Sequence, residues 1–210
     1  MKKLISDYKK RKGSIKKRLR DFDAVYEWGD NEIFGELCFC LFTPQAKAVL
    51  CDAAVKELKD KSFLFKGSRE DVRDVLKGKV RFQNNKAGYC VYARDLFKSK
   101  DGVKIKKRLN PEDTLNTREW LVKNVKGLGY KEASHFLRNI GLGADLAILD
   151  VHIMRNLKRY RVIKKLPKTL TRKNYLEVEN KMRAFSKKLG IPLEELDLLF
   201  WSRETGYIFK

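Results

Sequence analysis

Hydrophobic residues along this chain recur mainly at spacings of three and four positions, the period of one buried face of an α-helix. Several stretches keep this spacing, and they predict helices over residues 69–77, 84–98, 117–125, 130–140 and 151–160. A regular apolar stripe from Tyr175 to Leu189 predicts a long helix that Gly190 stops, and Pro192 begins a last helix. The alternation of apolar and polar residues that is typical of a strand is absent, except at the C-terminal tail. The pattern therefore predicts an all-α fold.

The beginning of the chain predicts three further helices. Ten Lys or Arg stand against one acid in the first 20 residues, and the apolar positions there favour a basic helix over a disordered arm; its face is Leu4, Ile5, Tyr8, Ile15 and Leu19. Residues 31–42 are apolar on nearly all sides, which is typical of a helix buried all round, although a short strand at 38–42 fits the same run. Thr43 as a cap and Pro44 at the first position predict the start of the next helix, which continues to Leu58.

Charge points to the kind of partner. The 210 residues include 48 Lys or Arg and 27 Asp or Glu, a net charge of +21, while 43% of residues are hydrophobic. That apolar share supports a packed core and excludes a disordered tail protein. No apolar run is long enough to span a membrane, and the basic N-terminus lacks the apolar middle of a signal peptide. A folded chain with this balance is expected to bind a polyanion, first nucleic acid and second an anionic membrane surface.

The spacing of the cysteines argues against a metal-binding or iron–sulfur protein. Cys38, Cys40, Cys51 and Cys90 match neither a C-x-x-C pair nor an iron–sulfur spacing, and the chain has only two histidines. We therefore expect no metal site. Buried, reduced thiols in a cytoplasmic protein are the expected reading of these residues.

A short glycine-rich link is the most informative segment. Gly127 and Gly129 separate two predicted helices, so the N–H groups that begin the second helix are exposed. Such groups, together with the helix dipole, bind a phosphate without reading base sequence. This is the pattern of a helix-hairpin-helix, the non-specific DNA clamp, although an ordinary helical hairpin that contacts nothing has the same appearance.

Two charged residues near this hairpin have the chemistry of catalytic groups. Lys131 lies in the first turn of the second helix, where the dipole and the nearby Lys126 favour a neutral amine that can attack an electrophilic carbon. A solvated surface lysine is the alternative. Asp150 ends an apolar run and precedes a basic helix, so it is placed as an N-cap. A capping carboxylate can also stabilise positive charge that develops beside it.

Longer motifs around these residues resemble a known family. The hairpin KGLGYK, a glycine-rich stretch and the aspartate of LAILDVH resemble the helix-hairpin-helix, Gly/Pro-rich, Asp superfamily of DNA glycosylases. EASHFLRNIG, DLAILDVHI and ELDLLFW more particularly resemble its archaeal-type branch, the type 2 8-oxoguanine DNA glycosylase/AP lyases. The resemblance covers residues 30–210 and is strongest over 120–155 and 193–210. The sequence departs from the family in having no proline in GLGAD, and in having Gln45 where members often have Asn.

The resemblance implies an architecture and an activity. Two helical subdomains are expected with a DNA-binding cleft between them. One covers residues 31–145, with the hairpin at about 117–140, and the other joins residues 1–30 to 146–210. Lys131 is then expected to face Asp150 across the cleft. The implied enzyme is a cytoplasmic, monomeric base-excision-repair protein without metal or cofactor, which excises 8-oxoguanine from double-stranded DNA and cuts the strand at the abasic site.

The same resemblance assigns roles to single residues. Lys131 matches the lysine that forms a Schiff base with the sugar, and Asp150 matches the catalytic aspartate. The hairpin glycines Gly127 and Gly129 match the phosphate clamp. The remaining matches are Gln45, which fills the hole left by the extruded base, His152 on a DNA phosphate, Phe82 and Trp201 as aromatic walls of the base pocket, and Lys210 in recognition of the oxidised guanine.

Each of these roles has a plainer alternative. Single aromatic residues such as Phe82 and Trp201 more often belong to a core, His152 is as typical of a structural histidine, and a terminal Lys210 is often frayed. Two other functions also fit the chain. One is the same scaffold acting on another oxidised base, as endonuclease III-like enzymes do. The other is a non-catalytic helix-hairpin-helix DNA-binding protein, which needs neither the lysine nor the aspartate.

Overall fold

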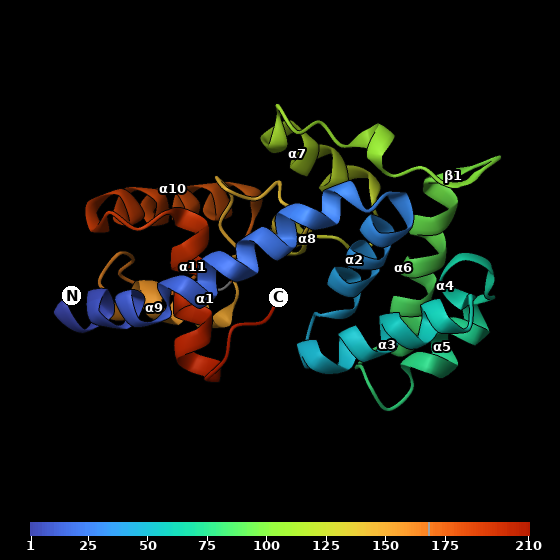
Figure 1. The fold of residues 1–210 in the computed structure, drawn as a ribbon, viewed down its shortest axis with the longest axis horizontal. Helices are drawn as coiled ribbons and strands as arrows, with labels where there is room; N and C mark the ends of the chain where they lie inside the picture. Colours follow the sequence, from blue (N-terminus) through green and yellow to red (C-terminus); the bar gives the residue numbers. More distant parts are fainter. Residues whose placement is uncertain (168) are drawn as a thin grey trace. The chain divides into compact units, whose positions relative to one another are not determined.

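The computed structural model describes residues 1–167 and 169–210, and nearly all of its regular structure is helical. This confirms the all-α prediction, with one short antiparallel hairpin, β1 (Lys98–Ser99) and β2 (Gly102–Val103), that the sequence pattern did not predict. The helices are α1 (Lys2–Glu27), α2 (Asp30–Phe42), α3 (Ala48–Asp60), α4 (Phe63–Lys66), α5 (Arg69–Leu76), α6 (Gln83–Leu96), η1 (Lys106–Arg108), α7 (Thr114–Asn124), α8 (Tyr130–Asn139), α9 (Val151–Arg159), α10 (Arg172–Leu189) and α11 (Leu193–Thr205), drawn in Figure 1.

The chain forms two compact units, Val25–Phe136 and Met1–Ala24 with Leu137–Lys210. The boundaries that the sequence suggested, after residues 30 and 145, stay a prediction. None of the helices in the described ranges is both long enough and apolar enough to cross a membrane.

Helix α2 forms the centre of the unit Val25–Phe136. It packs against α3 and α6, and α5 packs in turn against α6 and α3 (Figure 1). The expected all-round burial of this helix is confirmed, because nine of its residues are buried, including every residue from Leu37 to Phe42. Residues 38–42 are therefore helical, and the alternative of a short strand there is wrong.

The predicted start of the next helix at Thr43 and Pro44 is also wrong. Thr43 instead ends α2, because both its backbone N–H and its hydroxyl donate to the carbonyl of Cys40. Pro44 lies in a turn, and α3 begins only at Ala48. The sequence signal misled because Thr followed by Pro suits a turn after a helix as well as a helix start.

The glycine hairpin joins α7 to α8. Asp113 caps α7 by accepting a hydrogen bond from the N–H of Asn116. Gly127 has a φ of 87°, which only glycine adopts without strain, and a Cβ there would lie 2.3 Å from the ring of Tyr89 on α6. Across the hairpin, the hydroxyl of Tyr130 donates to Glu119 at 2.5 Å. The link is therefore fixed from both helices and packed against α6.

In the other unit, α11 packs against α9 and α10 (Figure 1). A buried ion pair joins Arg138 to Asp197 on α11 at 2.8 Å. The basic N-terminal segment is helical as predicted, and Leu4, Tyr8, Ile15 and Leu19 on α1 are buried. Ile5 is the exception, because it is 37% exposed and lies beside the buried face rather than on it.

The packing of Gly127 yields a test of the hairpin. Gly127→Ala should lower the free energy of unfolding by about 1–3 kcal/mol, because the new methyl group meets the Tyr89 ring and the positive φ becomes strained. Gly13→Ala is the matched control. Gly13 lies inside α1 with open space around it, so alanine should stabilise there by about 0.5–1 kcal/mol. Urea unfolding of both variants would measure the difference, and equal values would contradict this account of the hairpin.

Candidate functional site

Lys131 is the second residue of α8, at the point where the hairpin becomes a helix. The N–H of Ala133 donates to the carbonyl of Gly129 at 2.9 Å, which closes the first turn. The Lys131 side chain is only 23% exposed, and its Nζ lies 3.6 Å from Glu132 Oε1. The amine is thus partly withdrawn from water at the positive end of a helix dipole, as its position in the sequence predicted.

Two groups from other helices accompany this lysine. Cys51 on α3 and Lys86 on α6 both interact electrostatically with Lys131. Burial raises the pKa of the Cys51 thiol to about 11, against the opposing effect of the two ammonium groups, so Cys51 is a neutral thiol at physiological pH. Burial likewise lowers the pKa of Lys86 below its ordinary value. Sequence reasoning missed Lys86, which donates to the carbonyls of Phe42 and Pro44.

The hairpin presents backbone groups of the kind that bind phosphate. The first N–H groups of a helix point outward from its start, and the link before α8 contains two glycines that leave room for close approach. Gly127 and Gly129 are both exposed, and Leu128 between them is buried and anchors the link. This arrangement suits a phosphodiester, which is held through backbone groups and therefore without regard to base sequence.

Gln45 and Phe82 occupy unusual backbone positions in the same unit. Both have a positive φ, 54° for Gln45 and 59° for Phe82, and both side chains are exposed. Phe82 precedes α6 and is 52% exposed, with the Arg81 guanidinium 5.5 Å from its ring centre. An exposed aromatic ring held at a helix start is available for stacking, so Phe82 is not a core residue.

Asp150 caps α9, as its place in the sequence predicted. Its Oδ1 accepts a hydrogen bond of 2.8 Å from the N–H of Ile153, and the residue is half-buried. The extended segment before it is held by α10. There, Tyr175 donates to the carbonyl of Ala147 at 2.5 Å, and Glu179 accepts from the N–H of Ala147 at 2.9 Å. These two buried residues position the aspartate, a role that their place in an apolar stripe did not reveal.

The remaining predicted residues lie near α9 and α11 in the unit that contains Asp150. His152 lies on α9 and is half-buried. The ring of Tyr207 packs edge-on against Trp201, with centroids 5.3 Å apart, and Arg18 donates to the carbonyl of Phe209. The tail is thus folded back toward Trp201, and Lys210 is only partly exposed.

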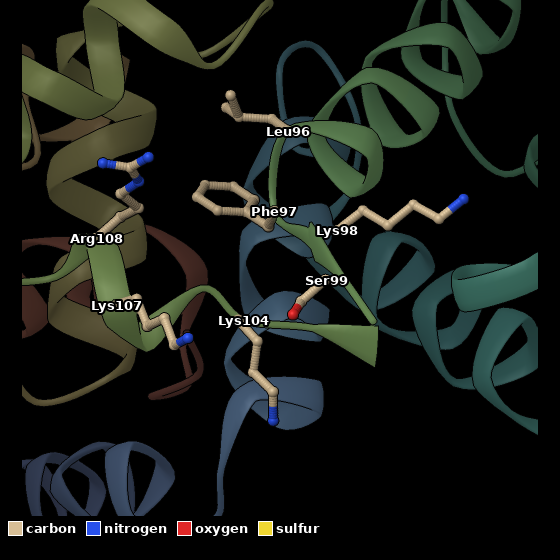
Figure 2. Close-up of a pocket in the computed structure, with 7 residues that line it drawn as sticks. All are labelled: Leu96, Phe97, Lys98, Ser99, Lys104, Lys107 and Arg108. Carbon is tan, nitrogen blue, oxygen red and sulfur yellow. The ribbon is translucent and has the colours of Figure 1, made fainter. Parts of the chain in front are cut away.

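A separate pocket lies at the β-hairpin. Its volume is about 370 Å³, and Figure 2 shows its lining: Leu96, Phe97, Lys98, Ser99, Lys104, Lys107 and Arg108. In Figure 2, Lys98 and Arg108 extend in different directions, so their charges do not converge on one point. None of the predicted site residues is in this lining.

The structure therefore gathers the predicted residues in two groups. Lys131, Gly127, Gly129, Gln45 and Phe82 belong to the unit Val25–Phe136, and Asp150, His152, Trp201 and Lys210 belong to the other. That Lys131 faces Asp150 stays a prediction. Among residues 1–167 and 169–210, no group of three or more His, Cys, Asp or Glu is arranged to hold a metal ion.

Comparisons with known proteins identify the family. The family model for 8-oxoguanine DNA glycosylase matches residues 15–191. The 8-oxoguanine DNA glycosylase/AP lyase of Fusobacterium nucleatum is 47% identical, over 97% of this chain and 94% of its own length.

Solved structures agree with that match. The Methanocaldococcus jannaschii 8-oxoguanine glycosylase/lyase, in complex with a 15mer DNA containing 8-oxoguanine, superposes with a TM-score of 0.85 at 38% identity, covering 99% of both chains. The 8-oxoguanine DNA glycosylase of Thermotoga maritima superposes with a TM-score of 0.88 at 33% identity, covering 100% of this chain and 97% of its own. The resemblance read from the motifs is confirmed, and this chain belongs to the helix-hairpin-helix family of 8-oxoguanine DNA glycosylases/AP lyases.

Proposed function

We propose that this chain is a bifunctional base-excision-repair enzyme that removes 8-oxoguanine from double-stranded DNA and then cuts the strand at the abasic site. The single observation that supports the assignment most is Lys131, a partly buried amine at the start of the helix that follows the glycine hairpin. A non-catalytic DNA-binding module has no use for an amine withdrawn from water at this place. Full-length relatives named as glycosylase/AP lyases support the same reaction.

DNA binding comes first. The net charge of +21 favours association with a polyanion, and the hairpin N–H groups hold one phosphate close to the lesion. The damaged base cannot react inside the helical stack, so it is extruded into a pocket. Phe82 and Trp201 stack on the extruded base, Gln45 fills the space that it leaves in the duplex, and His152 contacts a phosphate.

The chemistry then needs one amine and one carboxylate. The neutral amine of Lys131 attacks C1′ of the sugar while the bond from C1′ to the base breaks, and Asp150 stabilises the positive charge that develops on the sugar. Loss of a proton from Nζ and opening of the sugar ring give an iminium. The iminium makes the 2′ proton acidic, so that β-elimination expels the 3′ phosphate and cuts the strand.

The arrangement of the C-terminal tail beside Trp201 supports 8-oxoguanine as the substrate over other oxidised bases. The folded-back tail brings Tyr207 against Trp201. Lys210 directly follows Phe209, whose carbonyl accepts a hydrogen bond from Arg18. An ammonium and acceptor groups here can pair with the protonated N7 and the C8 carbonyl that distinguish this base from guanine. We place the enzyme in the cytoplasm, associated with the nucleoid of a prokaryote, and acting as a monomer.

Lys131→Gln should abolish strand cleavage and borohydride trapping while DNA containing the lesion still binds, because the amine is lost and the hairpin is kept. Lys126→Gln is the matched control, since Lys126 belongs to the same hairpin but lies over the ring of Tyr92. That variant should still form the trapped adduct. A Lys131→Gln protein that is trapped at the wild-type rate would show that another amine reacts and would refute the assignment.

Asp150→Asn should slow base excision about a hundredfold or more, because the charge beside the developing cation is removed. An amide oxygen can still accept from the N–H of Ile153, so unfolding free energy should fall by no more than about 1 kcal/mol. Asp113→Asn makes the same change in the cap of α7 and should leave excision unaltered. Single-turnover rates and urea unfolding give both numbers, and an unchanged rate would reduce Asp150 to a cap.

Lys210→Met should reduce 8-oxoguanine excision while sparing cleavage at a preformed abasic site, where no base has to be recognised. Loss of one polar partner of a buried base costs about 1–3 kcal/mol, a ten- to hundredfold effect. Lys188→Met, at an exposed position on α10, is the control for the lost charge. If both activities of Lys210→Met fall equally, or neither changes, the lesion is recognised elsewhere.

A further inference from the structure

One buried cation of the chain has no part in the proposed chemistry. Lys86 on α6 is 3% exposed, and its Nζ donates to the carbonyls of Phe42 and Pro44, each at 2.7 Å. Both carbonyls belong to the end of α2 and the turn that follows it. Burial lowers the pKa of this ammonium, which reflects the cost of holding the charge away from water, and the two hydrogen bonds offset part of that cost.

The turn that Lys86 contacts is the one that carries Gln45. The N–H of Ala46 donates to the carbonyl of Thr43 at 3.0 Å, so residues 43–46 form a hydrogen-bonded turn with Pro44 second and Gln45 third. Proline cannot take a positive φ, whereas Gln45 has a φ of 54°. A proline at the second position followed by a left-handed third residue is the pattern of a type II turn rather than type I.

These two turn types differ mainly in the orientation of the central peptide, here the one between Pro44 and Gln45. Turning that peptide over moves the Pro44 carbonyl to the opposite face and returns Gln45 to a negative φ. A residue with a Cβ disfavours the left-handed region, so Gln45 by itself favours the other orientation. The hydrogen bond from Lys86 to the Pro44 carbonyl opposes this preference, because it exists only in the observed orientation.

We infer that Lys86 is a positioning residue that locks this turn, and thereby sets the direction in which the Gln45 side chain is presented to DNA. The inference rests on the proposed function, in which Gln45 fills the space of the extruded base. Lys86 then acts through Gln45 and contacts neither the base nor the sugar. Its effect should be largest where a paired base has to leave the stack, and small where the site is already abasic.

A coupling experiment tests this role. Lys86→Met should reduce single-turnover excision of 8-oxoguanine opposite cytosine by about tenfold or more, and cleavage of a preformed abasic site by less than about twofold. Asparagine tolerates the left-handed region better than glutamine and keeps the amide. In a Gln45→Asn background, Lys86→Met should therefore reduce excision by less than about twofold. Each rate is divided by the fraction of protein that is folded. If Lys86→Met does not fold, Lys86→Gln, which keeps a neutral hydrogen-bond donor, is measured in its place.

Controls separate the possible outcomes. Lys79→Met removes a comparable bond, from Nζ to the carbonyl of Val75 at 2.9 Å, and should leave the ratio of excision to abasic cleavage unchanged. An equal loss of both activities in Lys86→Met, or an equal loss of excision in both Gln45 backgrounds, would overturn the inference, because Lys86 would then act on Lys131 or on general stability. The proposed function has a separate test, because the wild-type protein must form the borohydride-trapped adduct through Lys131 whatever the Lys86 variants do.

Discussion

Repulsion among 48 basic side chains is the constraint under which this fold forms, since 27 acids cannot neutralise them. The described structure meets it by leaving most of α1's cations in water and by giving buried cations specific acceptors. Arg138 pairs with Asp197, Arg118 donates to Ser134, and Lys86 donates to two carbonyls. Each buried cation therefore fixes local geometry, because losing an acceptor would leave a charge unsatisfied away from water.

The N-terminal ends of helices are the second feature on which the site depends, because each proposed catalytic residue lies at such an end. Lys131 is the second residue of α8, after a hairpin fixed by Gly127. Asp150 caps α9, after a segment held by Tyr175 and Glu179. At such positions the backbone dipole is strongest and the side chain is held by the first turn. Both side chains are therefore held in a defined place relative to the backbone, as the proposed reaction requires.

Much of this molecule follows from local sequence. The 3.6-residue period located most helices, Gly190 ended α10 in the left-handed conformation, and Asp150 proved to be a cap, because these features depend on neighbours within one turn. The hairpin at residues 98–103 escaped the pattern because each strand has only two residues, too few to show alternation. Thr43 and Pro44 misled because their local chemistry fits both a helix start and a turn.

The sequence by itself determined the helical class, the cap of α9 at Asp150, the basic character and, through its motifs, the family. Tertiary structure alone decided which residues support the site. Lys86 shares a face with Cys90, Ala93 and Phe97 and is buried with them, but only the approach of α2's last turn shows which carbonyls it holds. Glu179 likewise follows Tyr175 by one turn, and its partner is the N–H of Ala147, 32 residues away. Long-range acceptors have no signature in local spacing, because they are set by which segments the core brings together.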